Sequence, residues 1–315
     1  MTLPTVHVLY ENPAWLPPLE AGLRAEGLAH QLHDVGRGTI DLSTTPAEGV
    51  YWNRVSPSSH TRGHTTSVDF AIELLAWLEH HGRRVINGSC AFSLEISKLR
   101  QDLALHKYGI LTPRTVLAVG TEEIIAAAKT FTTPFLTKHN CSGKGLGIQL
   151  FDSAAALEKH ARSPIFDPGP RGQVILQEYI VPREPHITRV EIVGGKFLFA
   201  MHSSTAGGFE LCPADSCELE RRGPDVCPAD GQGEFTPALL TADDDLVQRY
   251  VRLCNQEGID VAGIEFVEDA QGLRYTYDIN CTTNYNGALG RRIGIDGMRE
   301  AARFIKSVAV SSSGG

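Results

Sequence analysis

Strand-like and helical segments alternate through residues 1–92, and this alternation is the strongest constraint on the fold. Short β-rich runs at 5–10 (TVHVLY) and 49–55 (GVYWNRV) precede a strongly periodic helix at 66–82 that ends at Gly82. Parallel strands need a long crossover connection, which is usually a helix. The sequence therefore predicts a small parallel α/β domain at the N-terminus.

The pattern changes after this domain. A helix is expected over 93–109, with Ser93 as its N-cap and Gly109 closing it. Further on, a hairpin at 186–204 turns at Gly194-Gly195, and a second pair of strands runs through DVAGIEFVED (260–269) and LRYTYDINC (273–281). Consecutive strands joined by tight turns are antiparallel. The C-terminal part is therefore expected to carry an antiparallel sheet.

Composition narrows the class of protein. The net charge of −8 in 315 residues argues against non-specific nucleic-acid binding, which needs a basic surface. No apolar run approaches the length of a membrane span, and the N-terminus lacks the pattern of a signal peptide. Seven scattered cysteines are then expected to be reduced thiols. We predict a cytoplasmic protein without nucleic-acid or membrane partners, and leave homo-oligomer formation open.

Residues 205–237 fit no helical or strand period. They contain Cys212, Cys217 and Cys227, but no CxxC pair and no assigned fourth ligand, so a zinc site is disfavoured. Long irregular segments inside a compact domain are usually functional lids or disordered. We expect a long mobile loop whose role stays open.

A glycine-rich loop, KHNCSGKGLG (138–147), separates the strand-like runs PFLT and IQLFD. The simplest interpretation is a hairpin turn, because glycine supplies the positive φ that tight turns need. The loop is not a Walker A motif, since the final Lys-Ser/Thr pair is missing, and it precedes a strand instead of a Rossmann helix. A loop between two strands whose backbone covers nucleotide phosphates remains.

Three oxygen-bearing side chains end the last two predicted strands. Asp278 and Asn280 are two residues apart, so they share one strand face, and a hairpin partner can bring Glu265 beside them. Two carboxylates and an amide oxygen suit Mg²⁺ held together with phosphate oxygens. Exposed polar positions would give the same short pattern. The interpretation as a metal site therefore depends largely on the lysines and glycines upstream.

Taken in order, these motifs resemble the ATP-grasp superfamily and, within it, the RimK-like glutamate ligases. The resemblance covers nearly the whole chain, and it is the order and spacing of the motifs that make it specific. The motifs are SKLRQDLALHKYGILTPRT (97–115), PFLTKHNCSGKGLGIQLF (134–151), QEYI (177–180), TRVEIVGGKFLFAM (188–201) and GIEF with YTYDIN (263–280).

The resemblance implies an α/β protein with three domains and ATP between the last two. These are an N-terminal parallel α/β domain at 1–92, a central lid domain with the glycine loop at 93–180, and a C-terminal antiparallel-sheet domain with the metal site at 181–310. Residues 311–315 are expected to be a disordered tail.

The resemblance also implies roles for individual residues. The residues matched to ATP contacts include two phosphate-binding lysines, the glycine loop, the hinge that meets adenine, and a ribose-binding acid: Lys98, Lys138, Ser142, Gly143, Lys144, Gly145, Gln177, Glu178, Tyr179, Ile180 and Glu184. Glu265, Asp278 and Asn280 match the ligands of magnesium, for which Mn²⁺ could substitute. Arg189 matches an arginine that faces phosphate or substrate.

The substrate region departs from the family pattern. After Asn280 the chain reads CTTNYNG where RimK-like enzymes tend to read Pro-x-x-Gly, so glutamate is not established as substrate. We predict that Arg189 and Arg291 anchor anionic groups, because a guanidinium bonds two oxygens at once. Arg189 is expected on the cleft side of its strand with Glu191 opposite. Substrate contacts are predicted at Asn53, Arg54 and Asn284, the first two because ligands sit at the carboxyl ends of parallel strands.

The function predicted from these residues is an ATP- and Mg²⁺-dependent carboxylate–amine ligase. ATP would phosphorylate a carboxylate, and an amine of a small molecule, amino acid or peptide would displace the phosphate. A small-molecule kinase on the same fold is the alternative, and it would release ADP without an amine. A catalytically weak nucleotide-binding protein is a third class, disfavoured by the intact lysines and oxygen ligands.

Overall fold

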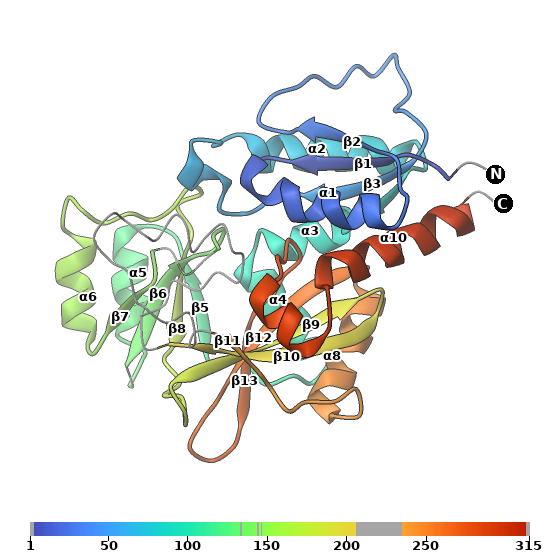
Figure 1. Ribbon diagram of the computed structural model, residues 1–315. Helices are drawn as coiled ribbons and strands as arrows, with labels where there is room; N and C mark the ends of the chain where they lie inside the picture. The colour runs from blue at the N-terminus through green and yellow to red at the C-terminus, as the bar shows by residue number, and fades with distance from the viewer. Residues whose placement is uncertain (1–2, 133, 144, 146, 206–234, 313–315) are drawn as a thin grey trace, which may run out of the picture.

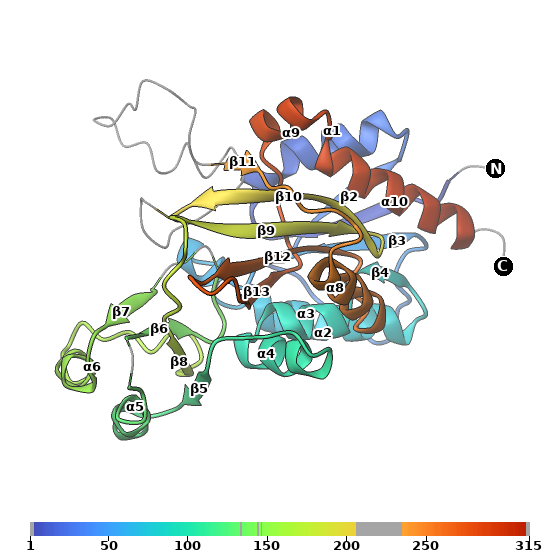
Figure 2. The ribbon, with the colours of Figure 1, turned by 90° about the horizontal axis from the view of Figure 1, so that it is seen from below.

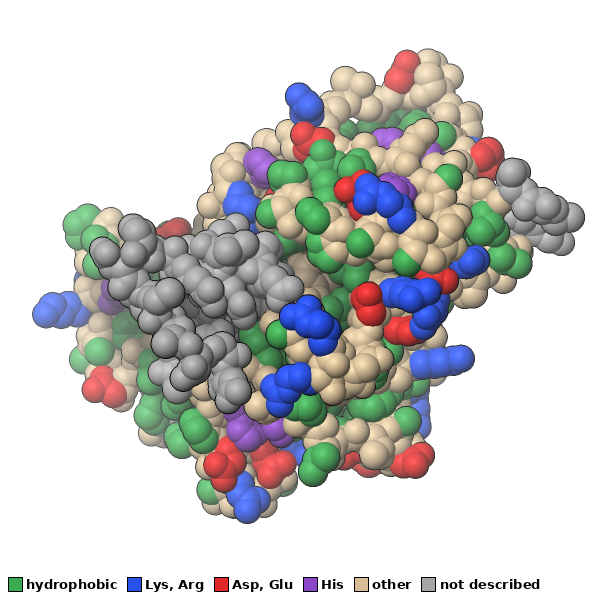
Figure 3. Space-filling view, viewed as in Figure 1, with side chains coloured by type: hydrophobic (Ala, Val, Ile, Leu, Met, Phe, Trp, Pro, Cys, Tyr) green, Lys and Arg blue, Asp and Glu red, His purple; other side chains and the backbone are tan. Residues whose placement is uncertain are grey.

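The computed structural model describes residues 3–132, 134–143, 145, 147–205 and 235–312. Three sheets organise them (Figure 1). The α/β class, the parallel N-terminal sheet and the antiparallel sheet of the C-terminal part, all predicted from the sequence, are confirmed. The central part carries a second antiparallel sheet that the sequence analysis did not predict. No helix in these ranges is long and apolar enough to cross a bilayer. On the face drawn in Figure 3, acidic and basic side chains are interspersed.

The N-terminal sheet is parallel, with the order β2-β1-β3-β4. Its strands are β1 (Val6–Tyr10), β2 (His30–Asp34), β3 (Val50–Arg54) and β4 (Arg84–Ile86). Helices α1 (Leu16–Ala25) and α2 (Ser67–His80) pack on it, with the short turns η1 (Pro13–Trp15) and η2 (Ser59–Arg62) near strand ends. Trp52 of β3 is completely buried in this core.

The second sheet, the lid sheet, is antiparallel in the order β5-β8-β6-β7. It consists of β5 (Thr115–Ala118), β6 (Phe135–His139), β7 (Gln149–Phe151) and β8 (Val174–Glu178). Helices α5 (Thr121–Ala128) and α6 (Ala154–Ala161) contribute Ile124 and Leu157 to a separate apolar core under it. The glycine loop joins β6 to β7.

The third sheet has the order β11-β10-β9-β12-β13 and is antiparallel. Its strands are β9 (His186–Val193), β10 (Lys196–Ser204), β11 (Phe235–Pro237), β12 (Val261–Glu268) and β13 (Arg274–Asn280). One face is covered by α3 (Ser89–Glu95), α4 (Lys98–Lys107) and α8 (Asp245–Gln256). α9 (Gly287–Ile293) and α10 (Gly297–Ser312) lie over the opposite face (Figure 2).

Three expectations about local structure were wrong. Residues 311 and 312, expected in a disordered tail, are the last two residues of α10, because this amphipathic helix continues past its contacts with the N-terminal domain. The helix expected over 93–109 is two helices, and the cap is Ser97, whose Oγ accepts from the Arg100 N–H, instead of Ser93. Residues 235–237 form β11 and so belong to the sheet. Cys212, Cys217 and Cys227, and most of the loop expected around them, lie outside the described residues.

Helix packing crosses the predicted domain limits. α3 and α4 share their core with the third sheet, and α10 packs along α1 and β3 of the N-terminal domain. The limits at 92, 180 and 310 therefore stay predictions. The contacts establish that the start of α4 lies between the lid sheet and the third sheet, since the Lys98 N–H donates to the Asn140 carbonyl after β6 and the Lys98 ammonium pairs with Asp278 of β13.

Candidate active site

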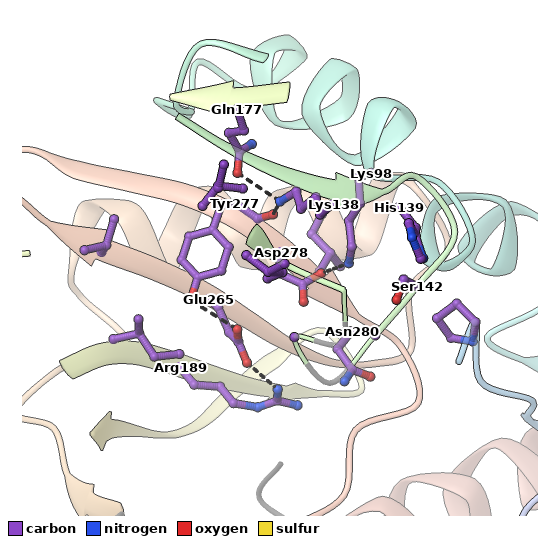
Figure 4. A pocket seen from close by; sticks show the side chains of 18 of the residues that line it. Lys98, Lys138, His139, Ser142, Gln177, Arg189, Glu265, Tyr277, Asp278 and Asn280 are labelled. Carbon is purple, nitrogen blue, oxygen red and sulfur yellow. Dashed lines mark hydrogen bonds and ion pairs between the residues drawn. The ribbon is translucent and has the colours of Figure 1, made fainter. Parts of the chain in front are cut away.

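A cavity of about 250 Å³ lies where the lid sheet, the third sheet and the loops of the N-terminal domain meet. Its lining contains most of the residues that the sequence assigned to nucleotide, metal, anion or substrate contacts (Figure 4). These are Lys98, Lys138, Ser142, Gly143, Gly145, Gln177, Glu178, Tyr179, Ile180, Arg189, Glu265, Asp278, Asn280 and Asn284. Segments far apart in the chain thus converge on one hollow.

Lys98 reaches the cavity from the first turn of α4. One helical turn later, the buried Gln101 clips this helix to β13: Nε2 donates to the Ile279 carbonyl at 2.7 Å, and Oε1 accepts from the Ile279 N–H at 3.0 Å. These two hydrogen bonds fix α4 beside β13, so that Lys98 lies next to Asp278 and forms an ion pair with it. Burial opposes the charge on Lys98, but Asp278 outweighs it and raises the pKa of the ammonium.

Lys138 reaches the cavity from β6 of the lid sheet and lies beside Lys98 (Figure 4). Its Nζ donates to Gln177 Oε1 at 2.9 Å and lies 5.7 Å from the centre of the Tyr277 ring. It has no carboxylate partner within the described residues. Burial, and then repulsion by Lys98, lower its pKa to about 8. Lys138 is therefore a desolvated cation placed to receive an anion.

Glu265 and Asp278 face one another directly, because β12 and β13 pair these two residues. A β-bulge follows at Glu265/Phe266 and leaves Tyr277 as the extra residue, so Tyr277 also lines the cavity. Its hydroxyl donates to Glu265 Oε2 at 3.3 Å. Burial raises the pKa of Glu265, with Asp278 adding to it, whereas Lys98 overcomes burial and holds the pKa of Asp278 low.

Asn280 completes the oxygen set at the end of β13. Its Oδ1 accepts from the Thr282 N–H at 2.9 Å. Behind this turn the buried carboxylate of Glu95 accepts from the Cys281 N–H and from the Thr282 hydroxyl, the latter at 2.8 Å. Glu95, which the sequence analysis missed, thus holds the turn that positions Asn280.

These three side chains fit a magnesium site. Within the described ranges, His, Cys, Asp and Glu alone form no group of three that could hold a metal ion. Two carboxylates plus the Asn280 amide oxygen, completed by phosphate oxygens and water, nevertheless match the preference of Mg²⁺ for few protein ligands. A divalent cation would also offset the repulsion between Glu265 and Asp278.

Arg189 is locked by three partners. Its Nε donates to Glu191 at 2.6 Å, Nη1 to Glu265 at 2.8 Å, and Nη2 to the Thr283 hydroxyl at 2.6 Å. Glu191 is therefore on the same side as Arg189, and the expectation of opposite sides was wrong, because residues two apart on a strand share a face. Gly263 is required here, since a Cβ would lie 2.1 Å from Arg189 Nη2.

The hinge after β8 forms an apolar end of the cavity. The Tyr179 N–H donates to the Pro134 carbonyl at 3.0 Å, whereas the Ile180 N–H has no backbone partner in the described part of the chain. Leu136, Ile148 and Val267 also line the cavity, and Leu136 pairs with Gln177 just before the hinge. A flat apolar group could fit here with one edge against the hinge backbone.

Two residues of the glycine loop have backbone geometry that favours glycine. Gly145 and Gly147 have φ of 71° and 75°. A Cβ on Gly147 would also lie 3.2 Å from the His139 ring, which lines the cavity. Lys144, predicted as a phosphate contact, lies outside the described residues.

The N-terminal domain closes the other end with Trp15, Ser56 and Pro57. Arg54 does not line the cavity but sits behind it: Nη2 donates to Asn284 Oδ1 at 2.6 Å and Nη1 to the Thr283 carbonyl at 2.9 Å. Asn284 itself lines the cavity, and Arg54 holds its side-chain oxygen from behind. Burial lowers the pKa of Arg54 to about 10, so it remains a cation near neutral pH.

Three other predicted site residues are not brought to the cavity. Asn53 is buried, where its side chain bonds the Asn87 carbonyl at 3.2 Å and the Val55 N–H at 3.1 Å, so it fixes the end of β3. Glu184 is exposed and borders a different hollow, beside His186 and His202. Arg291 lies exposed on α9. No described contact supports a substrate or ribose role for these three.

Sequence reasoning missed Glu95, Tyr277, His139, Trp15 and Ser56. Glu95 and His139 stand close in sequence to Lys98 and Lys138, which is a weak signal for a shared site. Tyr277 faces the cavity only because of the bulge. Trp15 and Ser56 depend on packing between domains, for which the chain carries no local pattern.

No protein-family model and no curated protein sequence matches the chain. Solved structures do. A RimK domain ATP-grasp protein from Sphaerobacter thermophilus superposes with a TM-score of 0.67 at 17% identity, covering 95% of this chain and 98% of its own. The chain has the ATP-grasp fold.

Two further structures extend the comparison of this ATP-grasp chain. The D-cycloserine synthetase DcsG has a TM-score of 0.64 at 18% identity, covering 97% of this chain and 99% of its own. The ATP-grasp ligase PsnB, complexed with minimal precursor, Mg and ADP, has a TM-score of 0.62 at 15% identity, with coverage of 97% and 99%. At these identities the likeness establishes the fold, while the activity is argued from the site.

Proposed function

We propose that this protein is an ATP- and Mg²⁺-dependent carboxylate–amine ligase. The observation that carries the proposal is Lys138, a buried cation without a carboxylate partner in the described ranges, facing Glu265 and Asp278 across one cavity. A cation on one side and a metal-binding acid pair on the other is the environment that a triphosphate needs.

ATP would bind with its base at the hinge. The apolar lining residues Leu136, Ile148 and Val267 suit adenine, and the Ile180 N–H can donate to a ring nitrogen. The triphosphate would then run toward Lys138 and Lys98. The backbone of the glycine loop would cover it from the lid side, as expected from the positive φ values of Gly145 and Gly147.

Glu265, Asp278 and Asn280 would hold magnesium, whose positive charge would offset the negative charge on the transferred phosphoryl group. Lys98 keeps Asp278 ionised, and Arg189 with Tyr277 orients Glu265. Glu95 fixes the turn behind Asn280. Catalysis by these residues is positioning and charge stabilisation, and no covalent enzyme intermediate is required.

The carboxylate substrate would lie between the metal end and the N-terminal domain. There the Asn284 side chain, held from behind by Arg54, can bond a substrate oxygen. The carboxylate attacks the γ-phosphate, giving an acylphosphate and ADP. The amine then attacks the acyl carbon, and phosphate leaves as the amide forms. The similar structures include a D-cycloserine synthetase and a ligase with a minimal precursor, so small-molecule and peptide substrates both merit testing.

A matrix of carboxylates, amino acids and short peptides, screened for ADP release with ATP and Mg²⁺, tests the proposal. A ligase should release ADP substantially only when a carboxylate and an amine are both present, and mass spectrometry should find an amide. A stable phosphoester formed without an amine would instead identify a kinase. Absence of ADP release across the matrix, although ATP binds, would favour a nucleotide-binding protein.

A further inference from the structure

A second cavity, of about 430 Å³, lies between α2, the α3–α4 segment and the lid sheet. It shares no lining residue with the candidate active site. Its size falls in the range of pockets that hold small organic molecules. The proposed ligase reaction uses none of its residues.

The floor of this cavity is apolar. Ile72 and Leu75 of α2, Phe92 of α3 and Ile96, which directly follows α3, line it, and Leu117 of β5 contributes from the lid sheet. Leu75, Phe92 and Ile96 are buried. An apolar ligand body would cover this surface, with a gain of about 25 cal/mol for each Å² removed from water.

The polar side of the same cavity is basic. Arg100 lines it and forms no ion pair within the described residues, and Arg171 lines it with only an exposed partner, Asp69, at 2.7 Å. Exposed pairs of this kind contribute little stability and exchange readily. The hydroxyl of Ser89 is buried at the cavity without a hydrogen-bond partner in the described part of the chain. No described acidic side chain lines the cavity.

We propose that this cavity binds a small organic carboxylate with an apolar alkyl or aryl body. The planar guanidinium fork matches a carboxylate, the floor takes the apolar body, and the Ser89 hydroxyl can donate to the ligand. Inorganic phosphate would satisfy the arginines but leave the floor uncovered. An amine would be repelled by both arginines.

Asn140 lies between the two cavities and links binding in one to the geometry of the other. Asn140 lines the second cavity, while its carbonyl accepts from the Lys98 N–H at 3.0 Å and its Oδ1 accepts from the Leu99 N–H at 3.0 Å. Asn140 also begins the glycine loop and donates to Gln173 Oε1 at 2.8 Å. A carboxylate seated here therefore stabilises the arrangement that presents Lys98, and it should strengthen ATP binding. By linkage, ATP must strengthen carboxylate binding by the same factor.

Titration calorimetry on the full chain without nucleotide tests the site, with phenylbutyrate as the probe and phenylbutanol and phenylbutylamine as neutral and cationic comparators. The carboxylate should bind one to one and about tenfold more tightly than either comparator. Arg100→Glu and Arg171→Glu should each weaken phenylbutyrate about tenfold. Arg24→Glu, the same charge change on an exposed face of α1, should leave its affinity unchanged.

Equal affinity for the alcohol or the amine would overturn the proposal, as would phenylbutyrate binding that both arginine variants retain, or no saturable binding. Binding lost in Arg100→Glu places the probe in this cavity and not in the active site. Ile72→Glu puts a like charge on the half-exposed floor, so retained affinity there would also contradict the assignment. Unchanged ATP affinity at saturating phenylbutyrate would overturn the coupling.

Discussion

Removal of the charge on Lys138 tests the electrostatics of the candidate site. Burial and repulsion by Lys98 lower its pKa to about 8. Such a lowering opposes the charged form by roughly 3 kcal/mol. In the free protein the side chain is then mostly charged near about pH 7 and mostly neutral near about pH 9. Because ATP binds the charged form, ATP affinity should fall about tenfold over that range.

Lys138→Met keeps the length of the side chain and removes the ammonium. A hydrogen bond to a charged group contributes about 1.5–3 kcal/mol, so this variant should bind MgATP roughly 10- to 150-fold more weakly. Its affinity should also stay level across the same pH range. Titration calorimetry at several pH values measures both effects. Lys196→Met, which removes an exposed lysine on the β9–β10 hairpin, is the matched control.

The folding stability should change with pH in the opposite direction to the ATP affinity. Between about pH 8 and about pH 10 the unfolded chain binds more protons at Lys138 than the folded protein does, so stability rises with pH. Wild type should therefore gain stability relative to Lys138→Met over this window, as followed by urea unfolding. A wild-type ATP affinity that is level with pH, or a variant with unchanged ATP affinity, would refute the assignment of Lys138 as the phosphate cation.

Four further predictions follow from the site. Asp278→Asn should retain ATP binding but lower turnover at least about hundredfold, and wild-type turnover at ordinary magnesium would remove the metal assignment. Arg54→Gln should raise the KM of one co-substrate several-fold with that of ATP unchanged; an effect on ATP alone would contradict the role of Arg54 behind Asn284. Arg189→Lys should lose most turnover, because an ammonium cannot bond Glu191, Glu265 and Thr283 in the same geometry; full activity would refute this. The hinge backbone should favour ATP over GTP in direct binding, and equal affinities would argue against it.

Local sequence patterns predicted the α/β fold, and the order of the motifs predicted which of them meet in one place. Alternating strands and helices revealed the parallel sheet, and hairpin turns revealed the antiparallel sheet of the C-terminal part, because both are properties of neighbouring residues. The prediction that the two lysines and the Glu265, Asp278 and Asn280 set lie together rested on motif order, which encodes which strands meet. The structure brings these side chains into one cavity, as the resemblance implied.

Residues that the sequence placed differently from the structure depend on the packing around them. Asn53 follows a parallel strand, as a substrate contact would, yet its amide is consumed by Asn87 and the backbone of Val55. Arg291 is near the metal end in sequence but exposed on α9. Tyr277 faces the cavity through a bulge that strand alternation cannot anticipate. Such contacts depend on packing between elements.

Label transfer from the carboxylate is the most direct test of the proposed ligase reaction. A carboxylate found by the ADP-release screen would be prepared with heavy oxygen in both positions and incubated with its amine, ATP and Mg²⁺. Attack on the γ-phosphate moves one labelled oxygen onto the phosphoryl group, so the released phosphate should carry one heavy oxygen for each amide formed. Unlabelled phosphate released alongside the amide would contradict the acylphosphate route and, with it, the proposed function of this site.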